Sequence, residues 1–373
     1  MHKKAEIKIE LLCHGIKTSE EGVSLKAYPT RGKSRAGVAG SGRNFIVNPG
    51  QKEEFVVNAG VLQPFLERSP FEFRKIDGKG WILRNGAKVC RATVFEPNWH
   101  STKAGELIRL HGRSSLALAL TNACRFKAER AGCKFCIIDI GNETVTHKPE
   151  DLAMAIKEIL NNAELRKFVD LDGFEGIVEP EDVNINSGTL DENALVKLYA
   201  KTAECIKAVS DLPIGIEITP IGKEHMLKLK NAGVDSIYIN IEAFSDSARK
   251  SMIPGKDRAY PREKYLEALE NAVEIFGENQ SASWILIGLE PVEETIKGCE
   301  AIAEVGAIPL PRAFRPLFGS ELETLPPPSV EDAKRIYSEW LKIVKNCDLD
   351  PRKTIAGCAK CGSCFPIREL LSD

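Results

Sequence analysis

Apolar runs of strand type alternate with amphipathic helical stretches from about residue 106 onward, and this alternation constrains the fold more than any other feature. Six strands are predicted, at residues 114–121, 181–188, 213–219, 235–244, 281–288 and 307–317. Helices are predicted after most of these strands, at 149–168, 192–209, 223–233, 262–277 and 292–306. Successive β/α units joined by right-handed crossovers close into a parallel barrel. We therefore predict an α/β fold built on a partial, six-stranded (β/α)6 barrel of TIM type.

The regions on either side of this barrel differ from it in their sequence patterns. Residues 1–105 hold short β-type runs and a hairpin signal at Asn85 and Gly86, which indicate a mixed or β-rich module. The glycine-rich stretch at 31–47 lacks the Lys-Ser/Thr ending of a phosphate-binding loop, so we expect a flexible or partner-facing loop there. We predict three parts: the module at 1–105, the barrel at 106–326, and a C-terminal helix with a cysteine-rich tail at 327–373.

Charge and cysteine content narrow the functional classes. The 51 basic and 53 acidic residues of the 373-residue chain give a net charge of -2, so no global charge favours nucleic acid or an anionic membrane. No signal-peptide core or membrane-length apolar run is present, and we expect a cytoplasmic protein. In a reducing compartment the 11 cysteines should not form a disulfide framework. We therefore interpret the clustered cysteines as metal ligands or redox groups. The scattered ones, expected to be small buried residues, are Cys13, Cys90, Cys205, Cys299 and Cys347.

Three cysteines lie close together after the first predicted barrel strand. Cys124, Cys133 and Cys136 leave eight residues in the first gap and two in the second. A 4Fe-4S cluster takes four ligands, so three thiolates would leave one iron open to bind a small molecule. Zinc is an alternative, although no second Cys or His pair accompanies these three, and unliganded cysteines are another.

This triad resembles that of the radical S-adenosylmethionine (SAM) superfamily, which carries three cysteines in the first loop of a β/α barrel. The family usually has three residues in the first gap, and subfamilies with longer gaps exist. The resemblance implies an enzyme in which a 4Fe-4S cluster and SAM yield a 5'-deoxyadenosyl radical that abstracts hydrogen from an unactivated carbon. It also implies a set of SAM-binding residues, which match in order along the chain: Phe135, Asn186, Ser187, Gly188, Glu217, Asn240, Glu242 and Arg315. Structural alternatives are a turn cap for Asn240 and a solvated ion pair for Glu242 and Arg315. No catalytic residue is predicted.

A second cysteine cluster ends the chain. Cys358, Cys361 and Cys364 repeat the Cys-x-x-Cys step twice. We expect an auxiliary 4Fe-4S cluster, with a structural zinc knuckle as the alternative. Candidates for its fourth ligand are Cys347, Cys13, Cys90 and Ser372.

The barrel and tail together resemble biotin- and lipoyl-synthase-like radical SAM proteins. Among these they are similar to a subunit of the archaeal two-component lipoyl synthase and to the nitrilase-cluster-associated family. This resemblance implies a sulfurtransferase for lipoate biosynthesis, in which the auxiliary cluster gives up sulfide to an octanoyl chain. The implied partners are an octanoylated lipoyl-carrier protein or peptide, a companion radical SAM subunit and an electron donor such as ferredoxin. Alternatives are an auxiliary cluster used only for electron transfer, in oxidation or modification of another substrate, and a non-catalytic zinc scaffold.

Overall fold

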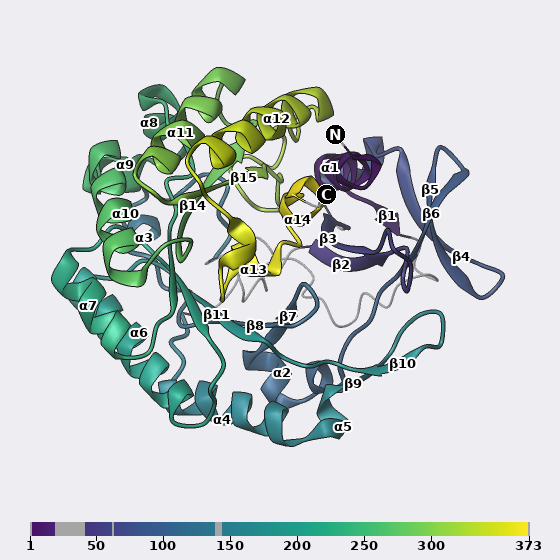
Figure 1. Cartoon of the computed structure of the whole chain (residues 1–373), viewed down its shortest axis with the longest axis horizontal. Helices are drawn as coiled ribbons and strands as arrows, with labels where there is room; N and C mark the ends of the chain where they lie inside the picture. Colours follow the sequence, from purple (N-terminus) through teal and green to yellow (C-terminus); the bar gives the residue numbers. More distant parts are fainter. Residues whose placement is uncertain (1, 19–41, 62, 139–143, 372–373) are drawn as a thin grey trace.

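The computed structural model describes residues 2–18, 42–61, 63–138 and 144–371. Within these ranges the chain forms a curled sheet wrapped by helices, a second sheet beside it, and a tail that returns to the centre (Figure 1). Residues 31–41 of the glycine-rich stretch, and the candidate ligand Ser372, lie outside the described residues. The remainder of that stretch, Gly42–Val47, forms strand β2, so the loop expected there is wrong. No helix in the described part of the chain is long and apolar enough to span a membrane.

The curled sheet confirms the predicted partial barrel. Its order is β15-β14-β13-β12-β11-β8-β7, with six parallel strands and β7 antiparallel to β8 at one edge. All six predicted strands are present, and the sheet consists of β7 (Arg109–His111), β8 (Ser115–Ala119), β11 (Asp182–Asn186), β12 (Ile214–Ile218), β13 (Ser236–Ile239), β14 (Ser281–Ile287) and β15 (Ile308–Ala313). Alternating strand and helix patterns thus produced the expected parallel topology.

Helices cover the outside of the curled sheet (Figure 1). The larger ones are α4 (Pro149–Asn161), α6 (Glu192–Lys207), α7 (Lys223–Asn231), α10 (Arg262–Phe276), α11 (Val292–Glu304) and α12 (Val330–Asn346). The helix predicted at 149–168 is shorter than expected. Asn162 ends α4 and caps the four-residue helix α5 (Ala163–Arg166), and a hairpin of β9 (Lys167–Val169) and β10 (Glu175–Ile177) follows. The short helices α2 (Lys103–Leu107), α3 (Arg125–Ala128), α8 (Asp246–Met252) and α9 (Pro254–Ala259) lie in the connections.

The N-terminal residues form a six-stranded sheet of order β1-β4-β5-β6-β2-β3, covered by helix α1 (Lys3–His14). The predicted hairpin is confirmed, because Arg84 pairs with Ala87 while Asn85 and Gly86 both have positive φ. Helix α1 was not predicted. The strands are β1 (Lys17–Thr18), β2 (Gly42–Val47), β3 (Phe55–Gly60), β4 (Phe71–Ile76), β5 (Lys79–Arg84) and β6 (Ala87–Thr93).

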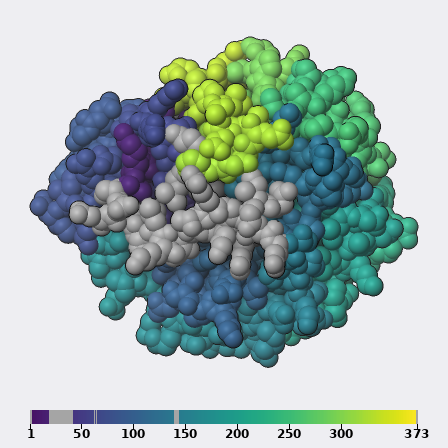
Figure 2. All heavy atoms as spheres, turned by 180° about the vertical axis from the view of Figure 1, so that it is seen from behind, coloured from purple at the N-terminus to yellow at the C-terminus, as the bar shows by residue number. Residues whose placement is uncertain are grey.

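This second sheet joins the two open edges of the partial barrel. Asn44 of β2 donates from Nδ2 to the Leu110 carbonyl of β7 at 3.4 Å, and the Asn58 amide of β3 donates to Asn44 Oδ1 at 2.9 Å. On the other side Arg315, just after β15, donates from Nη2 to the Asn58 carbonyl at 2.6 Å. Seen from behind, the N-terminal residues lie directly against the barrel (Figure 2). Six parallel strands do not close a barrel by themselves, and this sheet bridges the gap.

The tail folds back into the amino-terminal end of the barrel. It contains the turn Pro351–Lys353 and the short helices α13 (Cys358–Cys361) and α14 (Ile367–Leu371). Asp182, the first residue of β11, accepts a hydrogen bond from the Gly357 amide at 2.7 Å. The Tyr238 hydroxyl of β13 donates to the Ala356 carbonyl at 2.7 Å and accepts from the Ala359 amide at 3.1 Å. Gly357 has a φ of +86°, and an added Cβ would lie 2.4 Å from the Tyr238 ring, so only glycine fits this approach.

A buried ion pair fastens the tail to helix α1. Lys8 and Glu369 have side chains only 2% and 6% exposed, and their N–O distance is 3.0 Å. Lys8 also donates to the Gly362 carbonyl at 2.8 Å, which lies between two tail cysteines. All three polar groups therefore satisfy one another away from water.

We expect removal of one partner to destabilise the protein strongly. The substitution Lys8→Met removes the lysine that pairs with the buried Glu369 carboxylate, so the free energy of unfolding should fall by roughly 3 to 5 kcal/mol. Urea unfolding followed by circular dichroism would measure the loss. Lys297→Met, which breaks an exposed pair with Glu294, is the matched control and should leave the midpoint unchanged. Adding Glu369→Leu to Lys8→Met should restore most of the loss, and equal midpoints for the Lys8 and Lys297 variants would contradict this role.

Candidate functional site

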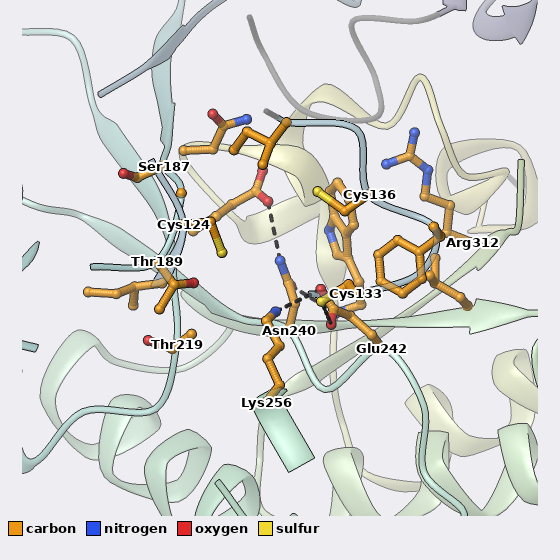
Figure 3. Close-up of a pocket in the computed structure, with 18 of the residues that line it drawn as sticks. Cys124, Cys133, Cys136, Ser187, Thr189, Thr219, Asn240, Glu242, Lys256 and Arg312 are labelled. Atoms are coloured by element: carbon orange, nitrogen blue, oxygen red, sulfur yellow. Dashed lines mark hydrogen bonds and ion pairs between the residues drawn. The ribbon is translucent and has the colours of Figure 1, made fainter. Parts of the chain in front are cut away.

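The first cysteine triad lies in the loop after β8, at the carboxyl ends of the parallel strands (Figure 3). Cys124 precedes helix α3, whose Arg125 amide donates to the Thr189 carbonyl at 2.7 Å. The Cys136 amide donates to the Cys133 carbonyl at 3.0 Å, and Lys127 Nζ donates to the Cys136 carbonyl at 2.8 Å. The eight-residue gap therefore accommodates one turn of helix before the chain returns to place all three cysteines around one cavity.

Cys133 lies beside a buried ion pair. Its Sγ is 4.0 Å from Glu242 Oε2, and Lys256 Nζ is 2.9 Å from Glu242 Oε1. Glu242 has a φ of +65°, an uncommon conformation that aims its carboxylate back at the triad. Burial, followed by the charge of Glu242, raises the pKa of Cys133 well above its usual value. Burial also raises the pKa of Cys136 to about 11. Without a bound metal these two thiols are therefore neutral at pH 7.

The chemistry of the triad fits an iron–sulfur cluster. Three half-buried sulfurs share one cavity, and each influences the others electrostatically. In the described ranges, no three His, Cys, Asp or Glu side chains converge closely enough to hold a single metal ion. A cluster places each thiolate on a different iron, so its ligands stand farther apart than those of one ion. Beside the triad, Asn186 Oδ1 and Ser187 Oγ are buried without a hydrogen-bond partner among the described residues, which leaves polar atoms for a further ligand.

The eight residues that the sequence assigned to SAM all line this cavity. Several of them already have partners. Asn240 donates to Glu217 Oε2 at 3.2 Å and accepts from the Trp284 amide at 3.1 Å, so it orders the cavity wall. Gly188 has a packing reason to be glycine, because an added Cβ would lie 1.9 Å from the Ala123 carbonyl oxygen. The solvated ion pair considered for Glu242 and Arg315 is absent from the described contacts, because Glu242 pairs with Lys256.

Arg315 has a different neighbourhood from the one expected. Its Nη1 and Nη2 donate to Asn58 Oδ1 and to the Asn58 carbonyl at 3.2 and 2.6 Å. Burial is the main cause that lowers its pKa to about 10. Its two terminal nitrogens therefore hold the N-terminal sheet, and binding of a SAM carboxylate by Arg315 stays a prediction.

The tail cysteines form a second cluster of thiols, on the side of the first triad that faces the amino-terminal end of the barrel. Cys358 donates to Glu217 Oε1 at 3.6 Å and accepts from Asn184 Nδ2 at 3.5 Å, while Cys361 Sγ is 3.2 Å from Ser363 Oγ. Burial raises the pKa of Cys361 to about 11, and that of Cys358 well above its usual value, with Glu217 and the other tail cysteines adding to the effect. The tail triad therefore lies in the amino-terminal half of the barrel, with Cys364 buried and Cys358 and Cys361 half-buried.

Two of the candidates for a fourth tail ligand share a core with the tail. Cys13 and Cys90 are buried in the cluster that also contains Cys364, and burial raises the pKa of each to about 12. Cys347 follows α12 and packs against the barrel core. The described contacts of the tail triad include none of these three. The scattered cysteines expected to be buried are so at Cys13, Cys90 and Cys299, and half-buried at Cys205 and Cys347.

One tail cysteine shares a cavity with the first triad. Cys358 lines the same cavity as Cys124, Cys133 and Cys136. Glu217 lies between them, and burial raises the pKa of its carboxyl despite the opposing charge of Arg312. A molecule bound in this space would meet the sulfurs of the first triad and that of Cys358.

Sequence reasoning missed several residues of this cavity. They are Lys256, Trp284, Arg312 and His111. His111 lies on the short edge strand β7, which was not predicted, and no pattern in the sequence places Lys256.

Comparisons with known proteins agree with this geometry. Residues 118–299 match the model of the Radical SAM superfamily. Bacteriochlorophyllide c C-7(1)-hydroxylase of Chlorobaculum limnaeum is 28% identical over 235 residues, which are 58% of this chain and 57% of that protein. This chain therefore spans little more than half of that relative.

Solved structures with partial similarity to this chain include two that are described as radical SAM enzymes and one hydrogenase maturase. A radical SAM methyltransferase from Sphaerobacter thermophilus has a TM-score of 0.44 and 13% identity, covering 81% of this chain and 82% of that one. The hydrogenase maturase HydG from Carboxydothermus hydrogenoformans has a TM-score of 0.44 and 16% identity, covering 63% and 51%. Coproporphyrinogen III oxidase (HemN) from Escherichia coli has a TM-score of 0.39 and 17% identity, covering 58% and 50%.

The superfamily implies one 4Fe-4S cluster and SAM. The segment that matches the superfamily model, residues 118–299, contains the first cysteine triad and four complete strands of the partial barrel, β11 to β14.

Proposed function

We propose that this radical SAM enzyme inserts sulfur at a C–H bond of a substrate bound between two iron–sulfur sites. The observation that carries the proposal is the position of Cys358, which lines the same cavity as the first triad. A tail cluster used only for electron transfer needs no access to the substrate, whereas a sulfur donor must reach the substrate carbon. Cys124, Cys133 and Cys136 would hold one cluster, and Cys358, Cys361 and Cys364 the other.

When bound, the first cluster and SAM supply a carbon radical that takes hydrogen from an unactivated carbon, and the second cluster supplies the sulfur that replaces it. The residues of this chain hold and enclose the reactants. Lys256 and Glu242 fix the surroundings of Cys133, and Asn186 and Ser187 offer unpaired polar atoms beside the triad. The tail closes the amino-terminal end of the barrel, which keeps water from a reactive carbon.

The substrate implied by the sequence resemblance is an octanoyl chain on a lysine of a lipoyl-carrier protein. We propose this as the first substrate to test, together with a companion radical SAM subunit and a ferredoxin-type electron donor. The relatives described above are named for hydroxylation, methylation, oxidation and hydrogenase maturation, and their names do not support sulfur insertion. Hydroxylation is a second candidate, favoured by the 28% identity to a bacteriochlorophyllide hydroxylase.

Labelled sulfide separates these two reactions. Protein reconstituted with heavy-isotope sulfide is incubated anaerobically with SAM, a reductant and an octanoyl-lysine peptide, and the products are analysed by mass spectrometry. We expect heavy sulfur in the product and 5'-deoxyadenosine in solution. Oxygen from labelled water in the product, with no sulfur, would favour hydroxylation and contradict sulfur insertion.

Single cysteine variants should separate the roles of the two triads. Cys133→Ala should reduce deoxyadenosine formation to background, because the first cluster loses a ligand. Cys361→Ala should keep deoxyadenosine formation and lose the thiolated product. Cys205→Ala is the control, since Cys205 lies on α6 outside the cavity and should affect neither. Thiolated product from the Cys361 variant would exclude the tail cluster as the sulfur donor.

Cluster binding should depend on pH. Burial raises the pKa of Cys136 and Cys361 to about 11, so both thiols carry protons at neutral pH and must lose them to bind iron. We therefore expect iron retention against a chelator to strengthen as pH rises from about 6 to about 8.5, after correction for the chelator's own titration. Reconstitution in weak buffer should release protons, and fewer from a variant lacking the tail cysteines. Iron retention that falls with rising pH would contradict this picture.

A further inference from the structure

A buried arginine faces the cavity from the last strand of the barrel. Arg312 on β15 is 3% exposed, and Trp284 on β14 and His111 on β7 are each 9% exposed. All three line the cavity with Cys358. The Arg312 guanidinium lies 4.6 Å from the centre of the Trp284 ring, and its charge acts on His111 across the gap between the two edge strands. Figure 3 shows Arg312 on the opposite side of the pocket from Ser187 and Thr189.

The polar atoms of these three side chains have no hydrogen-bond partner among the described residues. They are Arg312 Nη1 and Nη2, Trp284 Nε1 and His111 Nε2. The first three are obligatory donors, and His111 Nε2 donates in one tautomer. Buried donors without partners cost free energy, and a group that accepts from several of them would recover it. These unpaired donors therefore form a site that suits the acceptor oxygen atoms of a ligand.

The nearest charged side chains are already engaged. Glu217 accepts hydrogen bonds from Asn240 at 3.2 Å and from the Cys358 thiol at 3.6 Å, and it is not bonded to Arg312. Burial is the main influence on Glu217 and raises the pKa of its carboxyl, which favours the neutral form. Both terminal nitrogens of Arg315 donate hydrogen bonds to Asn58. The charge of Arg312 is therefore left without a direct anionic partner in the described structure.

We propose that Arg312, Trp284 and His111 form a subsite for a carboxylate of the substrate, next to Cys358. The planar guanidinium can donate two parallel hydrogen bonds to a carboxylate, and the indole N–H can donate a third. The location rests on the proposed function, because the cavity is taken as the place of reaction. The inference narrows the substrate class of the proposed reaction to molecules with a free acid group. It therefore argues against the amide-linked octanoyl chain proposed above as the first substrate to test, which offers one carbonyl oxygen and no charge.

A pair of probes of equal length tests the subsite. Octanoate and octanamide differ only in the acid group, and their binding to the anaerobically reconstituted full chain is measured by calorimetry. We expect octanoate to bind at least tenfold more tightly. Arg312→Met should weaken octanoate binding at least tenfold and leave octanamide unchanged, and Arg312→Lys should have an intermediate effect. Lys297→Met, an exposed cation removed far from the cavity, should bind both probes as the wild type does.

SAM also carries a carboxylate, so its binding is measured on the same proteins. We expect Arg312→Met to bind SAM with unchanged affinity, because the subsite belongs to the substrate. Loss of SAM binding with retained octanoate binding would assign the arginine to SAM and overturn the proposal. Equal binding of octanoate and octanamide to the wild type would overturn it as well, without any variant. These measurements need no turnover, so they give their answer whether or not sulfur insertion occurs.

Discussion

The insertion of the C-terminal tail into the partial barrel is the constraint on which the rest of the site depends. Tyr238 and Asp182 hold the tail backbone from inside the barrel, and Lys8 holds it from helix α1. These buried groups are hydrogen-bonded to the tail backbone, so the tail is fixed by directional contacts in addition to apolar packing. Because the tail is held in this position, Cys358 lines the same cavity as the first triad. The two ends of the chain thus complete a site that the barrel alone would leave open.

The charges around the cavity follow from this enclosure. Burial raises the pKa of Cys133, Cys136, Cys358 and Cys361. The protein without clusters therefore holds neutral thiols both at the carboxyl ends of the strands and in the amino-terminal half of the barrel. Binding of iron would convert them to thiolates and leave the cations nearby to balance the new negative charge. Lys256 acts on Cys133 and Lys127 on Cys136 of the first triad, and Arg312 acts on Cys358 of the tail triad.

The sequence was sufficient to predict the barrel because its strands and helices alternate without long interruptions. Each of the six parallel strands has enough apolar residues to be recognised by itself. The position of the N-terminal sheet could not be predicted, because it depends on contacts between distant residues such as Asn58 and Arg315. The place of the tail depends likewise on Tyr238 and Gly357 meeting inside the barrel.

The two arginines at the end of the barrel show the same limit of sequence-based prediction within the site. Arg312 and Arg315 are three residues apart, and the sequence drew attention to Arg315. The side that each faces depends on where β15 ends and on what covers that edge of the sheet. In the structure Arg315 is engaged by the N-terminal sheet, while Arg312 on the strand keeps its terminal nitrogens toward the cavity. Composition and spacing do not contain this information.

The central claim is that one chain holds two iron–sulfur clusters on two cysteine triads. Iron and acid-labile sulfide per chain, measured on anaerobically reconstituted protein, test it most directly. We predict about eight irons for the wild type and about four for a variant with Cys358, Cys361 and Cys364 replaced. About four irons in both proteins, with zinc in the wild type, would make the tail a structural metal site and leave sulfur insertion without a donor.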